Sequence, residues 1–251
     1  MAVPTYLVVY ILAADLGILA VVLIGLRQAL SSTDWPAALR TSTLRACGAL
    51  LIAWFVAALA LSWLEFFRGA PDRIPTIQLG VFLPILAGLA LWRAPFIRRA
   101  VEAVPLSWIV GVQAYRMLGV IFLVLYASGR MPAAFALPAG IGDIFTGLAA
   151  PIVAIAYARR LPGAERLVLS WNLFGLLDLV IAVTMGFLTS PSPLQLLSLD
   201  APNELISAFP MVMVPAFAVP LSVLLHLASL AKLRAAASRG RLSPGMFARS
   251  A

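Results

Sequence analysis

Long apolar runs separated by short polar segments make up most of the chain. A helix needs roughly 20 residues to cross a bilayer, with a range of about 17–25. Seven runs come close to that length, and we predict one helix for each, at about 4–26, 44–66, 77–92, 107–127, 137–157, 167–188 and 209–231. The runs are continuous, whereas the strands of a β-barrel alternate apolar and polar positions. The pattern therefore predicts an all-α bundle of seven transmembrane helices, in which the short third helix is the least tilted.

Basic residues are distributed unevenly over the polar segments. If the N-terminus lies outside, fourteen of the 18 basic residues fall on the cytoplasmic side, three fall outside and Arg116 lies in the membrane. Cytoplasmic loops carry such an excess of Lys and Arg. We therefore predict an external N-terminus, a transmembrane domain over 1–235 and a basic cytoplasmic tail over 236–251. The outer segment before the last helix has acids but no bases, and its leucines suggest a short interfacial helix: Leu194, Leu197 and Leu205.

Composition supports a membrane protein and limits its chemistry. Hydrophobic residues make up 63% of the chain and charged residues 11%, whereas soluble domains are about 45–50% apolar. The net charge of +8 does not point to nucleic acid, because the charges lie in short loops between apolar runs. A single cysteine, Cys47, and a single histidine, His226, leave no basis for a metal site or a cofactor. The Ala- and Arg-rich composition favours a bacterial inner membrane, with the lipid bilayer as the first partner.

Four ionisable side chains lie inside the runs: Asp15, Arg116, Asp143 and Asp178. Each costs at least about 2.5–3.5 kcal/mol near a helix centre, so such residues face the bundle interior. Counting at about 1.5 Å per residue places Asp143 roughly 6 Å towards the outside and the other three near the midplane. Arg116 is at the right depth to pair with Asp15 or Asp178, and Gln113 lies one turn away on the same face.

These groups allow a structural and a functional interpretation. A buried ion pair would fix which helix lies beside which, whereas a polar site would bind a solute, a proton or a cation. Three acids to one arginine leave two surplus negative charges, which a dry interior cannot hold. Protons, water or a bound cation must balance them, and this slightly favours the polar site.

Several weaker candidates surround this set. Thr146 shares the face of Asp143. The start of this helix is rich in small residues, which predicts either close packing or a contact with a substrate or an ion at the outer mouth. Asn172 is six residues from Asp178 and does not share its face, so we expect Asp178 inside and Asn172 near the inner end. We interpret His226 as a hydrogen-bonded packing residue rather than a ligand.

Prolines recur in the last run. Pro215 and Pro220 cannot donate backbone hydrogen bonds, so each frees a carbonyl four residues earlier, on Met211 and Ala216. Such a helix either has a static kink or uses the freed carbonyls to line a path for water or a cation.

Four stretches carry a resemblance to known proteins: QAYRMLG, FALPAGIGD, WNLFGLLD and FPMVMVPAFAVPLSVLLH. They resemble a group of uncharacterised bacterial integral membrane proteins with seven helices. The resemblance covers about the second half of the chain. It implies a bacterial source and this fold, and it implies no activity.

Three functions remain open on this basis. The first is a small-solute or proton- or cation-coupled transporter, with a polar site around Arg116. The second is an accessory or scaffold subunit, in which the polar residues fix helix pairing with other membrane subunits. The third is an intramembrane enzyme that uses carboxylates on a lipid-like substrate, which we favour least because no catalytic motif is present.

Overall fold

The computed structural model describes residues 4–242, and every regular element in this part of the chain is a helix. Six helical segments are long and apolar enough to cross a membrane, or seven if one sharply bent pair counts as a single span. The elements are α1 (Thr5–Ser31), α2 (Ala37–Trp63), α3 (Ile77–Ala90), η1 (Leu91–Arg93), α4 (Pro95–Ala103), α5 (Leu106–Gly111), η2 (Val112–Gly119), α6 (Val120–Ala127), α7 (Ala133–Ala158), α8 (Ala164–Thr189), η3 (Leu205–Ser207), η4 (Val214–Ala218) and α9 (Val219–Leu242).

Prolines mark the starts of four helices. Pro4, Pro36, Pro105 and Pro132 directly precede α1, α2, α5 and α7. Proline suits a helix start because its φ is already near the helical value and because an N–H there has no intrahelical partner. The apolar runs alone placed the starts of α2 and α7 several residues too late, because polar and small residues fill the first turns.

The third predicted helix differs from the expectation of one short span. α3 ends at Ala90, and after the turn η1 the chain bends by 90° into α4. At about 1.5 Å per residue, the 14 residues of α3 cover about 21 Å, less than the roughly 30 Å of hydrocarbon. Pro95 supplies the break, since it forces extended backbone on Ala94 and then begins the new helix.

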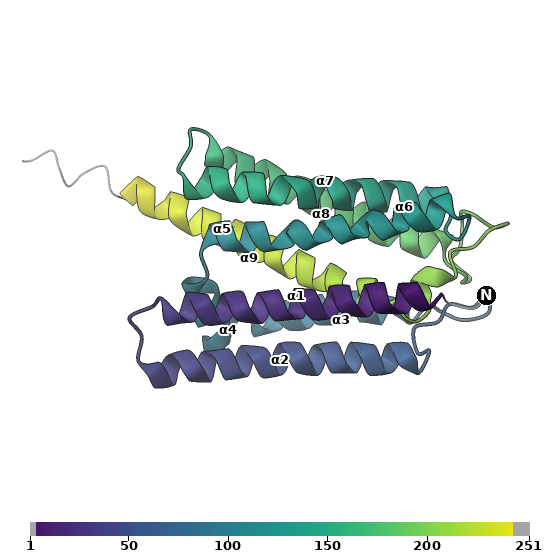
Figure 1. Ribbon diagram of the computed structural model, residues 1–251, viewed down its shortest axis with the longest axis horizontal. Helices are drawn as coiled ribbons and strands as arrows, with labels where there is room; N and C mark the ends of the chain where they lie inside the picture. Colours follow the sequence, from purple (N-terminus) through teal and green to yellow (C-terminus); the bar gives the residue numbers. More distant parts are fainter. Residues whose placement is uncertain (1–3, 243–251) are drawn as a thin grey trace, which may run out of the picture.

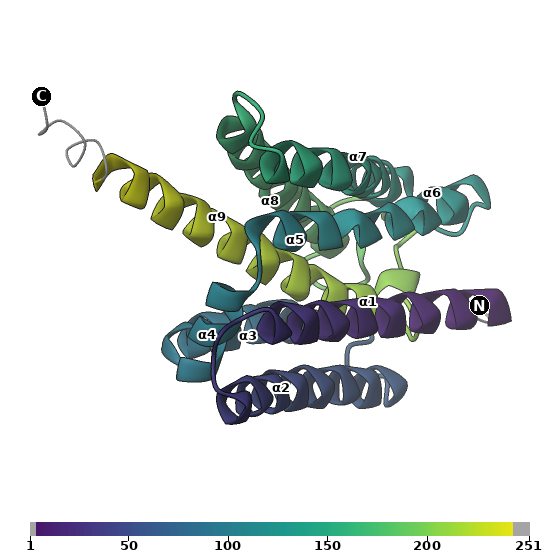
Figure 2. The ribbon, with the colours of Figure 1, turned by 60° about the vertical axis from the view of Figure 1, so that its left-hand side comes forward.

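The helices form two groups with α9 between them. Figures 1 and 2 show α1, α2, α3 and α4 on one side of α9, and α5, α6, α7 and α8 on the other. α9 crosses the bundle at a slant and packs against α3, α5 and α8. Side chains on α9 can therefore meet residues of both groups at the centre of the molecule.

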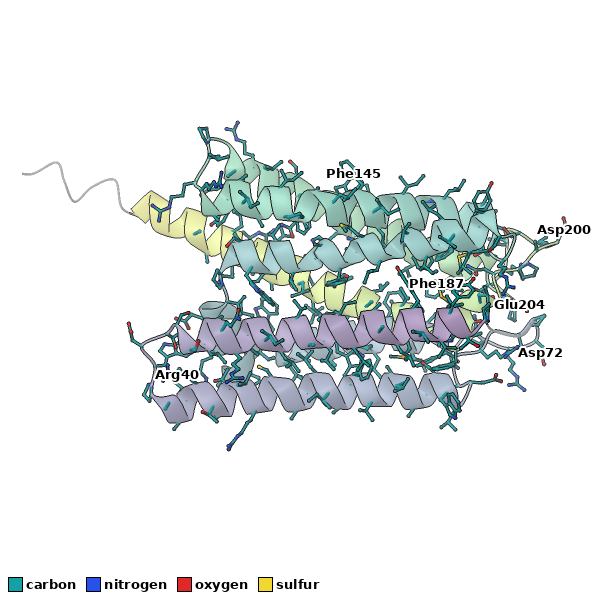
Figure 3. The ribbon with its side chains drawn as sticks, viewed as in Figure 1. Arg40, Asp72, Phe145, Phe187, Asp200 and Glu204 are labelled. Carbon is teal, nitrogen blue, oxygen red and sulfur yellow. The ribbon has the colours of Figure 1, made fainter. Side chains whose placement is uncertain are left out.

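The polar segments gather at the two ends of the bundle as the alternation of helices requires. Figure 1 places the α1–α2 turn, α4 and the α7–α8 turn at one end, and the α2–α3, α6–α7 and α8–α9 connections at the other. Arg40 lies at the first end, and acidic residues lie at the opposite end in Figure 3: Asp72, Asp200 and Glu204. Arg40 and these three acids are thus at opposite ends of the molecule.

Two segments differ from the prediction: the one before the last helix and the start of the C-terminal tail. An interfacial helix is predicted around Leu194, Leu197 and Leu205. Within the described segment 191–208 the structure has one short 3₁₀ turn, η3, which begins at Leu205, and Leu194 and Leu197 lie outside it. Its prolines cannot donate helical hydrogen bonds, and Leu196 and Leu197 instead donate to the carbonyl of Leu188. At the C-terminus, α9 continues to Leu242, so 236–242 of the predicted tail extends the last helix, and 243–251 lies outside the described residues.

Candidate functional site

Arg116 lies halfway along the span formed by α5, η2 and α6, where the α-helix tightens into the 3₁₀ helix η2. Its side chain is 2% exposed. Nε donates a hydrogen bond to Oδ1 of Asp143 at 2.8 Å, and Nη2 lies 2.8 Å from the same oxygen. Nη2 also contacts Oδ2 of Asp178. One guanidinium therefore bridges an acid of α7 and an acid of α8, and we call Arg116, Asp143 and Asp178 the triad.

The remaining nitrogen of the guanidinium connects the triad to α9. Nη1 donates to the carbonyl of Gly175 at 3.3 Å and lies 3.3 Å from Nε2 of His226. All three nitrogens of Arg116 therefore have partners, as a buried guanidinium requires.

His226 passes the connection on to Asn172. Its Nδ1 lies 2.9 Å from Oδ1 of Asn172, and Nδ2 of Asn172 donates to Ser229 at 2.9 Å and to the carbonyl of Val168 at 2.8 Å. Since an amide oxygen only accepts, Nδ1 of His226 carries the proton and Nε2 accepts from Arg116. In this arrangement the imidazole of His226 is neutral and hydrogen-bonded through both nitrogens, and the ring of Trp171 lies beside it with centroids 4.8 Å apart.

Asn172 is fully buried and lies in the third turn of α8, which begins at Ala164. It does not share a face with Asp178, as predicted, but the two residues belong to one network because Arg116 and His226 connect them. Side chains of neighbouring helices thus connect two residues that point to different faces of α8.

Glycines allow the helices to approach closely around the triad. A Cβ at position 142 would collide with the carboxylate of Asp178, and one at 175 would lie 2.5 Å from the ring of His226. A Cβ at position 119 would lie 2.6 Å from the side chain of Asp143. The glycines at these positions therefore allow close helix packing around Asp143, as one of the two predicted alternatives requires.

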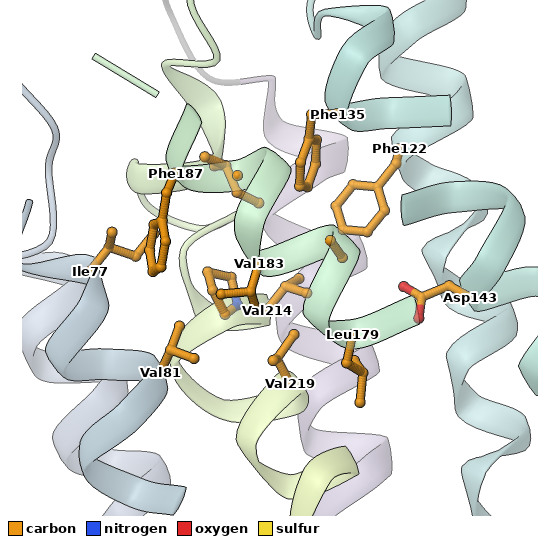
Figure 4. Close-up of a pocket in the computed structure, with 14 residues that line it drawn as sticks. Ile77, Val81, Phe122, Phe135, Asp143, Leu179, Val183, Phe187, Val214 and Val219 are labelled. Atoms are coloured by element: carbon orange, nitrogen blue, oxygen red, sulfur yellow. The ribbon is translucent and has the colours of Figure 1, made fainter. Parts of the chain in front are cut away.

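Two small cavities meet at Asp143. One of about 50 Å³ has mainly apolar walls, and several polar side chains also line it: Asp15, Tyr115, Arg116, Asp143 and Ser222. The other, of about 40 Å³, has Asp143 as the one ionisable group among apolar side chains, and Figure 4 shows that carboxylate beside Phe122 and Leu179. A water needs about 10–15 Å³ of such space, so each cavity has room for a few waters.

Three predicted site residues lie outside the hydrogen-bonded network. Asp15 is 1% exposed and lines the cavity of about 50 Å³, and its Oδ2 has no hydrogen-bond partner among the described residues. Gln113 and Thr146 are buried, and neither the amide of Gln113 nor the hydroxyl of Thr146 finds a partner there. Arg116 thus pairs with Asp178, one of the two predicted acids, and with Asp143 in place of Asp15.

The carbonyls freed by prolines are occupied. Around Pro215 the helix widens into the π-helical turn η4. The carbonyl of Ala216, freed by Pro220, accepts a hydrogen bond from the indole of Trp54 at 3.1 Å, and that of Met211 accepts from the N–H of Val214 at 3.0 Å. Each freed carbonyl therefore accepts a hydrogen bond within the bundle, and the interpretation of Pro215 and Pro220 as kinks stays a prediction.

Sequence reasoning missed three hydroxyl groups near the network, those of Ser222 and Ser229 on α9 and of Tyr115 on η2. Ser222 and Ser229 lie at i and i+7 around His226 at i+4, so the three residues share one face of α9. The hydroxyl of Ser222 donates to the carbonyl of Ala218, and the hydroxyl of Tyr115 donates to Ser222 at 2.8 Å. That spacing of a histidine and two serines was visible in the sequence and would have indicated the face of α9 that meets the network.

Comparison with known proteins places the chain in a family. No curated protein and no solved structure matches it. A family model matches residues 74–234, a range that contains the triad, His226 and Asn172, whereas Asp15 precedes it. The match covers more than half of the chain, which therefore belongs to the family described as Domain of unknown function (DUF8737).

Proposed function

We propose that the protein is a proton-coupled transporter of a bacterial inner membrane, in which the triad binds and releases the proton. The observation that carries this proposal is that two carboxylates share one guanidinium inside the bundle, and that one of them, Asp143, borders two water-sized cavities.

Charge balance supports a proton in the triad. Arg116 does not deprotonate in proteins, so two ionised acids beside it leave one surplus negative charge away from water. His226 is neutral and cannot compensate that charge. A proton on either carboxylate makes the triad neutral, and a site that needs one proton for neutrality is suited to taking it up and passing it on.

The exposure of the side chains supports Asp143 as the group that exchanges the proton. Its side chain is 18% exposed, against 6% for Asp178 and 2% for Arg116. Asp15, on α1, lines the cavity of about 50 Å³ that Asp143 also borders, and its Oδ2 has no hydrogen-bond partner among the described residues. Waters in that cavity would connect the two acids, and Asp15 would be the next proton carrier.

The cavities also bear on the transported molecule. At about 40 and 50 Å³, they are too small for a solute, for which pockets of about 300–1,000 Å³ are usual. A solute would therefore pass only after the helices move. The 3₁₀ segment η2 and the π turn η4 border these cavities, and such irregular turns within helices often act as hinges.

Proton flux in liposomes tests the proposal. Protein is reconstituted with a trapped pH-sensitive dye, a pH gradient is applied, and its decay is followed with and without small anionic, cationic and neutral solutes. We expect Asp143→Asn to abolish the protein-dependent decay and Asp34→Asn, on an exposed turn, to leave it unchanged. Equal decay in wild type and Asp143→Asn for every solute carried would overturn the assignment.

A scaffold subunit is the second candidate, and a different observation favours it. Every nitrogen of Arg116 is already paired, and glycines let the helices pack closely on the network. In that case the network only fixes helix pairing. A stoichiometric partner subunit in mild detergent extracts, with no protein-dependent proton flux in liposomes, would support the scaffold over the transporter.

A further inference from the structure

A larger cavity lies away from the triad, on the other side of α9. Its volume is about 400 Å³, and α1, α2, α3, α4, α5 and α9 all contribute to its walls. The lining is almost wholly apolar and includes three of the six tryptophans, Trp54, Trp92 and Trp108. An apolar cavity holds no stable water but accepts apolar ligands, and this volume is within the usual range of ligand sites, about 300–1,000 Å³.

The amphipathic helix α4 closes one end of this cavity. Ile97, Ala100, Val101 and Val104, spaced for one helix face, line it. Arg98, on the other face, is exposed. Such a helix lies in the plane of a membrane interface with its apolar side down, which agrees with the bend of 90° between α3 and α4.

Lys232 of α9 holds α4 in this position. Its ammonium donates to the carbonyls of Val101 and Glu102, at 2.6 and 3.1 Å. These carbonyls belong to the last turn of α4, where backbone acceptors have no helical partner. The end of the cavity is therefore a fixed part of the fold.

Basic groups lie beside the closed end, and no acid offsets most of them. Arg93 and Arg98 are exposed and Arg99 is half-buried, whereas α4 has one acid, Glu102. These arginines are on the side predicted to be cytoplasmic, where anionic lipids attract basic side chains. Hydrocarbon walls next to a cationic rim match the two parts of an anionic phospholipid.

We propose that this cavity binds an acyl chain of an anionic phospholipid from the surrounding leaflet, with the phosphate headgroup at Arg98 and Arg99. Leu50 and Leu83 line the cavity and are also 37% and 62% exposed, so the cavity is not sealed from the surroundings of the bundle. The chain enters from that side, and the lipid is a bound component of the protein rather than part of the general boundary layer.

Native mass spectrometry from nanodiscs of phosphatidylcholine with phosphatidylglycerol tests the proposal. We expect the wild type to retain one phosphatidylglycerol, preferred roughly 30-fold over phosphatidylcholine if each of two arginines contributes as a typical surface cation does. Ala87→Phe and Ala100→Phe fill the cavity and should abolish retention. Ala90→Phe is the matched control, since Ala90 is exposed on α3 and does not line the cavity.

Removal of charge gives a second arm that does not depend on filling the core. Arg98→Gln with Arg99→Gln should keep a retained lipid but lose most of the preference for phosphatidylglycerol. Arg159→Gln, at the same end of the bundle but on the α7–α8 turn, should keep it. No retained lipid in the wild type, equal retention of both lipids, or equal effects of Ala87→Phe and Ala90→Phe would each overturn the proposal.

Discussion

Replacing Arg116 by alanine should lower the free energy of unfolding by about 3–5 kcal/mol, the usual cost of removing one partner of a buried ion pair. The substitution removes the hydrogen bond of 2.8 Å to Asp143, the contact with Asp178 and the donor to the carbonyl of Gly175. It leaves the acids of Asp143 and Asp178, at least one of them ionised, buried without a cation. At tenfold per 1.4 kcal/mol, the unfolding equilibrium shifts by roughly 100- to 5,000-fold.

Unfolding in mixed micelles, with increasing amounts of a denaturing detergent and near-UV circular dichroism as the readout, measures this change. Arg159→Ala is the control, and it should stay within about 0.5 kcal/mol of wild type because Arg159 is exposed. Adding Asp178→Asn to Arg116→Ala should restore part of the loss, since fewer unpaired charges remain buried. Arg116→Ala as stable as the control, or a double variant with no recovery, would refute the ion-pair reasoning.

Two further substitutions test the packing around the network and the proline carbonyl. Gly142→Ala should destabilise the protein by about 1–3 kcal/mol because the new Cβ collides with the carboxylate of Asp178. Gly17→Ala is the control, because there is open space around its Cβ. It should be neutral or stabilising by up to about 1 kcal/mol in the same assay. Trp54→Phe should lower the free energy of unfolding by about 1–3 kcal/mol because it leaves the carbonyl of Ala216 without its donor. The control Trp63→Phe, at an exposed position, should have little effect. Equal losses of stability in the two variants would contradict this account.

Much of the fold follows from the length of the apolar runs, because a bilayer fixes how long a spanning helix must be. Six of the seven predicted runs coincide with continuous spans. The third does not, because hydropathy carries no signal for the direction of the chain after Trp92. The bend depends on Pro95 and on the amphipathic pattern of 97–104. That pattern predicts a separate helix only when it is analysed apart from the apolar run 77–92.

The members of the site were predictable, but their partners were not. The free-energy cost of an ionised side chain in the membrane identifies Asp15, Arg116, Asp143 and Asp178 one at a time. Which of them form ion pairs depends on which helices lie side by side. Depth counting favoured Asp15 over Asp143 because the start of the fifth run was placed at 137. α7 begins at Ala133, and the earlier start brings Asp143 nearer the middle of the helix, to the level of Arg116.

The buried neighbours of the network were harder to see for another reason. Gly142 and Gly175 matter through what a Cβ would strike on another helix, and a single sequence does not give that distance. The face of α9 formed by Ser222, His226 and Ser229 was readable from spacing alone. Its use became clear only once the slant of α9 placed it against Arg116 and Asn172.

Infrared spectroscopy of the protein in lipid tests most directly whether the triad carries an exchangeable proton. A protonated carboxylic acid has a carbonyl stretch distinct from that of a carboxylate, and it shifts when the proton is replaced by deuterium. We predict such a band in the wild type at neutral pH, and its loss or change in Asp143→Asn and in Asp178→Asn but not in Asp34→Asn. A wild type without the band, or a band that neither triad substitution alters, would contradict the account.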